Sequence, residues 1–328
     1  MDNAIFIIAI CVLVFTIIGH FGLPFGTKVS IREIDYDSLS QDKQPFFKIQ
    51  ENKEIAVILI HGYAGTPLTM SFLAEELFEN GASVFAPLLP GHGEDAEAFS
   101  KTRYEHWEKK VKQVFDEIRP LYKKVFLVGF SMGGNLCLKV IEELPTYRQP
   151  NGVITISAPM ILNGFANGRI FYKDWKLTLS GLIQYVIKFI PKVKESKFSL
   201  RLSPWNGYGK HHPLAALHSL KINIRKTRRS LSKIKVPLCI IQIQNDKTVE
   251  PENAHFIARK VNSIEKRVFI FPLRENFTSR HRSITHLYSR DRVAHYIKRF
   301  IDDVCKQFDA YEMKSASWKS EKNKDEET

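Results

Sequence analysis

The chain has 328 residues, of which 44% are hydrophobic and 25% are charged, and its formal net charge is +13. These values are ordinary for globular proteins and exclude an intrinsically disordered chain or a collagen-like fibre. The length allows two small domains or one large domain with an insertion. No CxxC pair occurs, so neither a zinc site nor a disulfide framework is predicted from the four cysteines, Cys11, Cys137, Cys239 and Cys305.

The N-terminus carries the longest apolar run. Residues 4–18 read AIFIIAICVLVFTII, and no charged side chain occurs from residue 3 to residue 25. About 20 mostly apolar residues suffice to cross ~30 Å of hydrocarbon as a helix. We therefore expect an uncleaved, single-pass transmembrane anchor at residues 1–27. The alternatives are a buried helix and a cleaved signal peptide, although the latter lacks a basic start and a small-residue cleavage site. The basic residues Lys28, Arg32 and Lys43 follow, which predicts a cytoplasmic location for the folded domain.

Short apolar runs alternate with helical stretches along the middle of the chain. Such runs are typical of strands buried on both faces of a parallel sheet. The alternation stops near Met160 and resumes near Pro237, so it predicts a mostly parallel α/β sheet with helices on both faces and an inserted cap. The expected strands are 55–60, 83–89, 125–130, 152–156, 237–243 and 267–271, and the expected helices are 68–80, 105–121, 135–144 and 291–300.

The predicted domain organisation follows from this pattern. The core comprises residues 28–159 and 236–308, the cap residues 160–235, and a polar, disordered tail residues 309–328. The cap contains sixteen Lys and Arg but only two acidic residues, so it carries the positive charge of the whole chain. This segment needs an explanation of its own.

The cap contains one strongly apolar stretch. Residues 175–190 read WKLTLSGLIQYVIKFI, which predicts a helix that is apolar over most of its surface. This helix either lies buried over the site or faces lipid, where Lys176, Lys188 and Lys192 would meet anionic headgroups. Nucleic-acid binding by the basic run RKTRR at residues 225–229 is disfavoured, because no recognition motif accompanies it.

A candidate nucleophile lies between an expected strand and an expected helix. The residues Gly129-Phe130-Ser131-Met132-Gly133 fit the pattern G-x-S-x-G, whose glycines permit a tight strand-to-helix turn that projects the serine hydroxyl. The spacing G-x-G-x-x-G is absent there, so a dinucleotide site is not indicated. Ser131 is therefore the predicted nucleophile.

A nucleophilic serine needs a base and an acid that orients the base. Asp246 follows the expected strand 237–243 and is the first candidate acid, with Glu250 as its substitute. His281 and His286 both lie between the last expected strand and the last helix, and both remain candidate bases.

Three other histidines fit the role of base less well. His61 precedes the serine in the chain, so we expect it to brace the loop after the first core strand. His92, in the Pro-Gly-His-Gly loop, is expected to be structural, and His295 lies within the last predicted helix.

Together these motifs resemble the α/β-hydrolase superfamily, in its carboxylesterase, monoacylglycerol lipase and serine aminopeptidase-like branch. The resemblance covers roughly residues 50–305 and favours His281, because that branch typically places its histidine in S-x-H before the last helix. Two features depart from the family pattern: Arg282 after the histidine, and a long segment between Phe271 and His281. The motifs are HGYAG at 61–65, APLLPGHG at 86–93, VGFSMGG at 128–134, QND at 244–246 and SRH at 279–281.

The resemblance implies a function. Ser131 would attack an acyl ester, with His281 as base, Asp246 orienting it, and the Met132 and Tyr63 amides as oxyanion hole. No metal or cofactor is expected, and a serine at this turn disfavours epoxide hydrolases and dehalogenases. The expected substrate is a lipid-like ester such as a monoacylglycerol or lysophospholipid. A serine peptidase or acyltransferase, or a repurposed membrane-tethered binding protein, are the alternatives.

Overall fold

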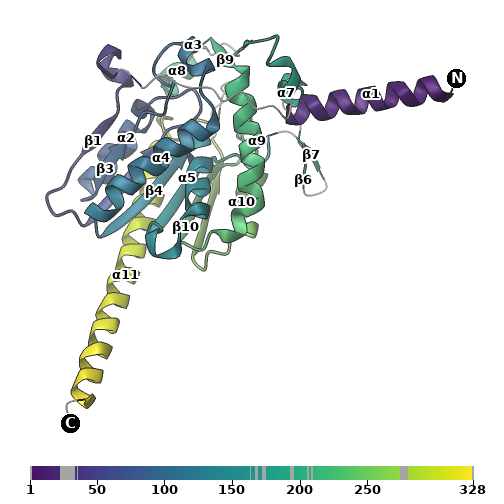
Figure 1. Cartoon of the computed structure of the whole chain (residues 1–328). Coiled ribbons are helices and arrows are strands. Elements are labelled where there is room, and N and C mark those ends of the chain that lie inside the picture. Colours follow the sequence, from purple (N-terminus) through teal and green to yellow (C-terminus); the bar gives the residue numbers. More distant parts are fainter. Residues whose placement is uncertain are drawn as a thin grey trace.

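A seven-stranded sheet forms the centre of the domain (Figure 1). The computed structural model describes residues 2–22, 34, 36–162, 164–166, 169–171, 175–192, 196–204, 207, 210–273 and 280–326. The strand order is β1-β3-β2-β4-β5-β10-β11; β1 is antiparallel to β3, and the other neighbours are parallel, as predicted. The strands are β1 (Phe46–Lys48), β2 (Ile55–Ile60), β3 (Ser83–Ala86), β4 (Lys124–Phe130), β5 (Gly152–Ile156), β10 (Leu238–Ile243) and β11 (Lys266–Phe271).

Helices cover both faces of the sheet. Alternate residues of β2 point to opposite faces, so Ile58 packs in one apolar core with α4, α5 and α10, and Leu59 packs in the other with α2 and α11. Each fully buried aliphatic side chain of this kind contributes about 1.5–3 kcal/mol to folding. The core helices are α2 (Ser71–Glu79), α3 (Ala96–Ser100), α4 (Tyr104–Ile118), α5 (Met132–Glu143), α10 (Glu252–Lys260) and α11 (Arg290–Glu326).

The chain between β5 and β10 is an insertion, because these two strands pair directly in the sheet. Its longest helix is α9, of 17 residues. The inserted elements are β6 (Gly164–Ala166), β7 (Arg169–Phe171), α6 (Trp175–Thr178), α7 (Ser180–Ile183), β8 (Phe189–Pro191), α8 (Lys197–Leu202), β9 (His211–Pro213) and α9 (Leu214–Ser230). Short 3-10 helices complete the described structure: η1 (Tyr36–Ser38), η2 (Gln41–Lys43), η3 (Pro67–Met70), η4 (Arg119–Leu121), η5 (Thr146–Arg148) and η6 (Leu231–Lys233).

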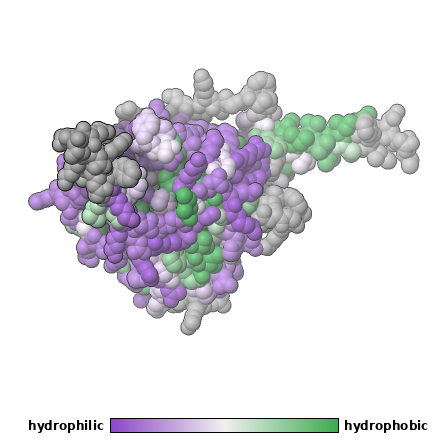
Figure 2. All heavy atoms as spheres, turned by 90° about the horizontal axis from the view of Figure 1, so that it is seen from below, coloured by the Kyte–Doolittle hydropathy of each residue, from purple (hydrophilic) through white to green (hydrophobic). Residues whose placement is uncertain are grey.

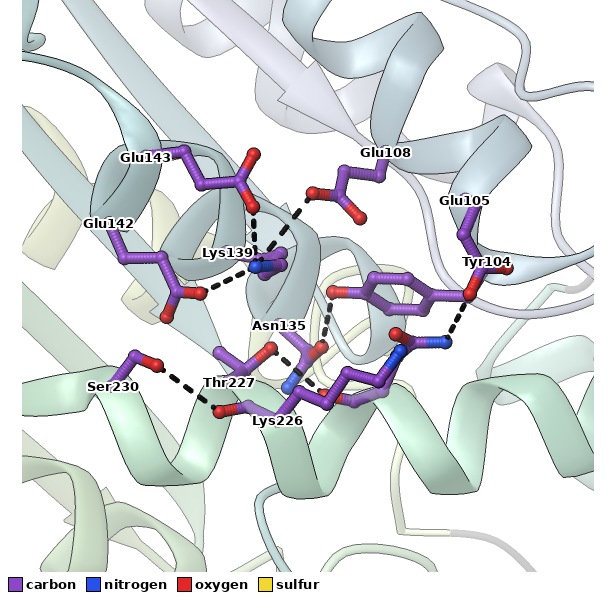
Figure 3. Close-up of polar contacts among 11 residues, drawn as sticks. Tyr104, Glu105, Glu108, Asn135, Lys139, Glu142, Glu143, Lys226, Thr227 and Ser230 are labelled. Atoms are coloured by element: carbon purple, nitrogen blue, oxygen red, sulfur yellow. Dashed lines mark hydrogen bonds and ion pairs between the residues drawn. The ribbon is translucent and has the colours of Figure 1, made fainter. Parts of the chain in front are cut away.

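Helix α9 fastens the insertion to the core helices α4 and α5 (Figure 3). The buried hydroxyl of Tyr104 on α4 donates a 2.7 Å hydrogen bond to Asn135 Oδ1 on α5. The Tyr104 amide donates to Ser219 Oγ on α9 at 3.0 Å, and the side-chain amide of Asn223 donates to Glu105 Oε1 at 3.0 Å. These bonds satisfy polar groups at the contact, so the insertion and the core meet in one defined register.

The end of α1 (Asp2–Phe21) packs against the insertion. A Cβ atom on Gly181 of α7 would lie 2.6 Å from the Ile18 carbonyl oxygen and 2.8 Å from that of Gly19, so only glycine allows this approach. The Arg225 guanidinium of α9 lies 5.1 Å from the ring centre of Phe21. The preceding part of α1 projects from the domain (Figure 1), and its described side chains form an apolar projection from a mostly hydrophilic surface (Figure 2).

The predicted transmembrane anchor at residues 1–27 is not supported. A spanning helix needs about 20 apolar residues to cross ~30 Å of hydrocarbon. Within the part of the chain that the structure describes, no helix meets that requirement of length and apolar character. Lys28 and Arg32, which the predicted orientation used, lie outside the described residues.

The apolar stretch 175–190 forms two short helices and a strand instead of the single predicted helix. The Lys221 amino group donates hydrogen bonds to the carbonyls of Leu177 at 2.7 Å and Thr178 at 3.2 Å, where α6 ends. These bonds satisfy carbonyls that a continuing helix would use. After α7 the Val186 and Ile187 amides both bond to the Ile183 carbonyl in a turn, and β8 then begins at Phe189.

The C-terminal segment also differs from the prediction. Helix α11 continues to Glu326, where the sequence predicts a disordered tail at residues 309–328. Its polar stretch contains Ala310, Met313 and Lys314, all strong helix formers. High helix propensity therefore accounts for this C-terminal part of α11, which no apolar repeat in the sequence predicts.

Candidate active site

Ser131 lies in a strained turn between β4 and α5. Its backbone angles are φ 54° and ψ −119°, which a non-glycine residue rarely adopts. A Cβ on Gly129 would collide with the backbone of Gly133 and Gly134, and a Cβ on Gly133 would lie 2.8 Å from the His61 carbonyl oxygen. The two glycines of the G-x-S-x-G pattern are thus required by close backbone packing.

A hydrogen-bonded chain joins Ser131, His281 and Asp246. The Ser131 hydroxyl lies 2.7 Å from His281 Nε2, and His281 Nδ1 lies 2.7 Å from Asp246 Oδ2. The Asp246 carboxylate is completely buried, and its Oδ1 accepts hydrogen bonds from the amides of Thr248 at 2.7 Å and Val249 at 3.0 Å. An imidazole that donates from Nδ1 to this carboxylate presents Nε2 as the acceptor for the serine proton.

The other candidate base and acid make different contacts. His286 is buried, and its Nδ1 accepts a 3.3 Å hydrogen bond from the Tyr288 amide. The backbone carbonyl of Glu250 accepts hydrogen bonds from both the backbone and the side-chain amide of Asn253, near the start of α10. Ser279, the first residue of the S-x-H motif, lies outside the described residues.

The loop after β2 presents Tyr63, one of the two predicted oxyanion donors. His61 braces this loop: its Nε2 accepts a 3.2 Å hydrogen bond from the Leu89 amide, and its Nδ1 lies 3.0 Å from the Gly62 carbonyl. Burial lowers the pKa of His61 to about 4, so the ring is neutral at pH 7 and Nδ1 is the donor. Ala64, next to Tyr63, has a positive φ of 58°.

Met132, the other predicted oxyanion donor, is the first residue of α5. The first N–H groups of a helix have no partner within the helix, and the helix dipole favours negative charge there. The Ser131 carbonyl accepts from the Gly134 amide at 2.9 Å, which shows that the helix begins immediately after the serine. This position suits stabilisation of an oxyanion.

His92 lies beneath the same loop as a structural side chain. It is completely buried, and its Nδ1 lies 3.2 Å from the Pro90 carbonyl. Burial is the main reason that the pKa of His92 lies well below its usual value, and electrostatic repulsion from the nearby His61 lowers it further. Trp107 of α4 donates from Nε1 to the same Pro90 carbonyl at 3.0 Å.

Two features of the site were missed by sequence reasoning. The Tyr63 hydroxyl donates a 3.0 Å hydrogen bond to the Pro213 carbonyl of β9, which joins the loop to the insertion. Asn253 Oδ1 accepts from the amides of Met160 at 2.6 Å and Ile161 at 2.7 Å, which fixes the start of the insertion. The sequence offered one hint of the role of Asn253, which is a polar residue beside apolar residues in a short helical stretch.

Comparison with known proteins decides the family. A family model described as Hydrolase_4, serine aminopeptidase, S33, matches residues 51–273. The chain belongs to this serine aminopeptidase family. The match covers six of the seven strands of the sheet, from β2 to β11, together with the insertion and the turn at Ser131.

Curated relatives of this S33 protein are esterases and lipases. It is 29% identical over 231 residues to the thermostable monoacylglycerol lipase of Bacillus sp. strain H-257, covering 69% of this chain and 83% of the relative. It is 25% identical over 214 residues to the carboxylesterase of Bacillus subtilis strain 168, covering 65% of this chain and 80% of the relative. The protein is a hydrolase of the carboxylesterase or lipase type.

Solved structures share the fold. A structure reported for the metagenome-derived lipolytic enzymes LipS and LipT aligns with a TM-score of 0.68 at 21% identity, covering 81% of this chain and 99% of that chain. A soluble variant of the monoglyceride lipase from Saccharomyces cerevisiae aligns with a TM-score of 0.64 at 18% identity, covering 86% and 98% respectively. The S33 protein therefore has the α/β-hydrolase fold.

Proposed function

We propose that this S33 protein hydrolyses lipid-like carboxylic esters through Ser131, His281 and Asp246. The observation that carries the proposal is the chain of two 2.7 Å hydrogen bonds from the Ser131 hydroxyl through His281 to the buried Asp246 carboxylate. A serine hydroxyl is a weak nucleophile at its ordinary pKa, and an adjacent oriented imidazole activates it.

The proposed reaction has two halves. Ser131 Oγ attacks the acyl carbonyl while His281 Nε2 takes the hydroxyl proton, and the Met132 and Tyr63 amides receive the negative oxygen. The bond to the alcohol then breaks as His281 returns the proton to the leaving oxygen. Water repeats these steps on the acyl-enzyme and releases the carboxylic acid. Asp246 stays ionised and stabilises the imidazolium that forms in each half.

A lipid-like acyl group is supported by two observations. The Bacillus relative is named a monoacylglycerol lipase. The insertion, in its described residues, exposes large apolar side chains: Trp175 is 50% exposed, Tyr185 54% and Val186 88%. Exposed apolar side chains of this size are available to meet apolar ligands.

A fluorophosphonate probe tests the nucleophile, because it reacts with activated serines. We expect labelling of the wild type and none of Ser131→Ala. Ser157→Ala is the matched control: Ser157 follows the adjacent strand β5, is buried, and also has a positive φ, of 49°. Equal labelling of the wild type and Ser131→Ala would contradict the assignment.

Turnover tests the substrate class. Monoacylglycerols and p-nitrophenyl esters of increasing chain length should be hydrolysed by the wild type and not by Ser131→Ala, whereas aminoacyl-naphthylamides should be poor substrates. Preferential cleavage of the naphthylamides would indicate a peptidase instead. Probe labelling without turnover of any ester would indicate a different acyl acceptor or a repurposed site.

A further inference from the structure

The buried side chain of Asn253 joins the insertion to the loop that carries Asp246. Asn253 is the second residue of α10 and is completely buried. Its Oδ1 accepts hydrogen bonds from the amides of Met160 at 2.6 Å and Ile161 at 2.7 Å, and its Nδ2 donates to the Glu250 carbonyl at 2.8 Å. One amide group therefore holds the first residues of the insertion on one side and the Asp246 loop on the other.

The loop between β10 and α10 binds the Asp246 carboxylate with its own backbone. Asp246 Oδ1 accepts hydrogen bonds from two amides of this loop, of which the Val249 amide lies at 3.0 Å. The Val249 carbonyl accepts a 2.9 Å hydrogen bond from the Gln242 side chain of β10. The next residue is Glu250, whose carbonyl accepts from both the backbone amide of Asn253 at 3.0 Å and its Nδ2. A displacement of Glu250 would therefore move an amide that fixes the carboxylate.

The start of the insertion is bound from its other side by the helix of the predicted nucleophile. Helix α5 begins directly after Ser131, and its buried Asn135 donates from Nδ2 to the Pro159 carbonyl at 3.1 Å. The same peptide group carries the Met160 amide that donates to Asn253. In the sheet, β5 lies between β4, which ends before Ser131, and β10. One peptide group after β5 thus connects the helix of the nucleophile to the loop of the acid.

Asparagine meets all the hydrogen-bonding demands of this position. An amide side chain offers two acceptor lone pairs and two donor hydrogens, so it can bind two N–H groups and one carbonyl at once. A carboxylate accepts but cannot donate, and an apolar side chain would deprive the buried amides of Met160 and Ile161 of this acceptor. Buried polar networks in which every member is satisfied are rigid, and a catalytic carboxylate needs a rigid support.

We propose that Asn253 is a positioning residue for ester hydrolysis: by holding the Glu250 carbonyl against the start of the insertion, it keeps the Asp246 carboxylate aligned with His281 Nδ1. The inference rests on the proposed function, in which Asp246 orients the imidazole and stabilises the imidazolium. A carboxylate that is out of line stabilises the imidazolium less in the transition state, whereas binding of the uncharged ester in the ground state is unaffected. Asn253 therefore acts on kcat and not on KM.

Two variants separate positioning of the acid from attachment of the insertion. Asn253→Ala removes both the acceptor and the donor, whereas Asn253→Asp, ionised at pH 8, keeps an acceptor for the two insertion amides and cannot donate to the Glu250 carbonyl. With the short ester p-nitrophenyl acetate at pH 8, both variants should lower kcat about 10- to 100-fold and leave KM nearly unchanged, because displacement of a catalytic group by about 1 Å costs up to ~10²-fold.

Asn151→Ala is the matched control. Asn151 is half-buried directly before β5, and its Oδ1 accepts a 2.9 Å hydrogen bond from the Val125 amide at the start of β4, so it lies at the opposite edge of the sheet from Ser131. The same change of side chain there should lower stability and leave kcat at the wild-type value. Circular dichroism gives the folded fraction of each variant, to which kcat is normalised.

The hydrogen bond between His281 and Asp246 provides a readout that attachment of the insertion alone would not move. An Nδ1 proton in a short bond to a carboxylate gives a proton NMR resonance at low field, which is identified here as the one that His281→Ala removes. We expect this resonance to shift or broaden in Asn253→Ala and Asn253→Asp and to stay in place in Asn151→Ala.

Three results would overturn the positioning role. These are wild-type kcat in folded Asn253→Ala, a low-field resonance that stays in place in that variant, and a fall in kcat in Asn253→Ala that is absent from Asn253→Asp. If Asn253→Ala does not fold, kcat and the resonance of Asn253→Asp decide. Wild-type turnover by Ser131→Ala or His281→Ala would refute the proposed function itself, whereas a failure confined to the Asn253 variants would leave that function standing.

Discussion

The hydroxyl of Tyr63 and the carbonyl of Pro213, 150 residues apart in the chain, are joined by a 3.0 Å hydrogen bond. Tyr63 lies in the loop after β2 that carries a proposed oxyanion donor, and Pro213 ends β9 of the insertion. The Tyr63 ring also contacts the Phe99 ring, with 4.9 Å between the ring centres. The position of the insertion and the position of the Tyr63 amide are therefore coupled through one side chain.

Tyr63→Phe removes this coupling and keeps the ring. We expect the free energy of unfolding to fall by about 1 kcal/mol, the typical contribution of one hydrogen bond. The kcat/KM should fall more for long-chain than for short-chain esters, because a long acyl group depends more on the insertion. Urea denaturation and kinetics with a chain-length series measure the two effects. Tyr147→Phe, at an exposed position, is the control; equal losses on short and long esters would contradict the coupling.

Substitution of the two candidate histidines separates their roles. His281→Ala should lower kcat by about 10⁴-fold or more, because only binding and the oxyanion hole remain when a triad member is lost. His286→Asn keeps an acceptor for the Tyr288 amide and should keep kcat near the wild-type value. Steady-state kinetics, normalised to the folded fraction by circular dichroism, provide the comparison. If His286→Asn lowers kcat strongly and His281→Ala does not, His286 is the base.

We expect the free energy of unfolding to depend on pH through the titration of Glu108 (Figure 3). Burial, and then the negative charge of Glu143, raise the pKa of Glu108 from 4.5 to about 7, although Lys139 opposes this shift. Between these values the folded state binds more protons than the unfolded state, so this group makes stability fall as pH rises from 4.5 to 7. Above pH 7 the penalty is constant, and below pH 4.5 it is absent.

Glu108→Gln resembles the protonated side chain and removes that penalty. The variant should be more stable than the wild type at pH 8 and similar to it below about pH 5. Urea denaturation at the two pH values measures the difference. Glu117→Gln, at an exposed position on the same helix, should show no such pH dependence. If Glu108→Gln is destabilised equally at both pH values, its carboxylate acts through packing and not through titration.

The contact between α1 and the insertion depends on Gly181. Gly181→Val places side-chain atoms where the Ile18 and Gly19 carbonyl oxygens lie, so we expect α1 to separate from α7. Hydrogen exchange should then become faster in residues 175–183 and unchanged in β4. Ser232→Ala, at an exposed position in η6, is the control. Unchanged exchange in α6 and α7 would show that the contact adds nothing to their stability.

Motif and periodicity were sufficient for most of the core. Continuous apolar runs such as β5 were predicted at the observed residues, because a strand buried on both faces leaves a strong local signal. The predicted positions of Ser131, Asp246 and His281 relative to the strands also agree with the geometry, since strand ends of a parallel sheet meet at one edge.

The insertion and the termini were harder to predict for physical reasons. The break between α6 and α7 depends on Lys221, which lies more than 40 residues further along the chain, so no local pattern announces it. The helical end of α11 lacks an apolar repeat, and only propensity favours it.

The contacts that α1 makes link this N-terminal helix to the stability of the insertion. Helix α1 contacts α7 and, through the Phe21 ring, Arg225 of α9, and both belong to the insertion. The insertion meets the core through α9. In thermodynamic terms α1 is an intramolecular ligand of the insertion, present at a high effective concentration because it is covalently joined. Whatever binds the exposed apolar surface of α1 competes with or reinforces that ligand. Binding at the exposed side chains of α1 would thereby change the stability of the insertion.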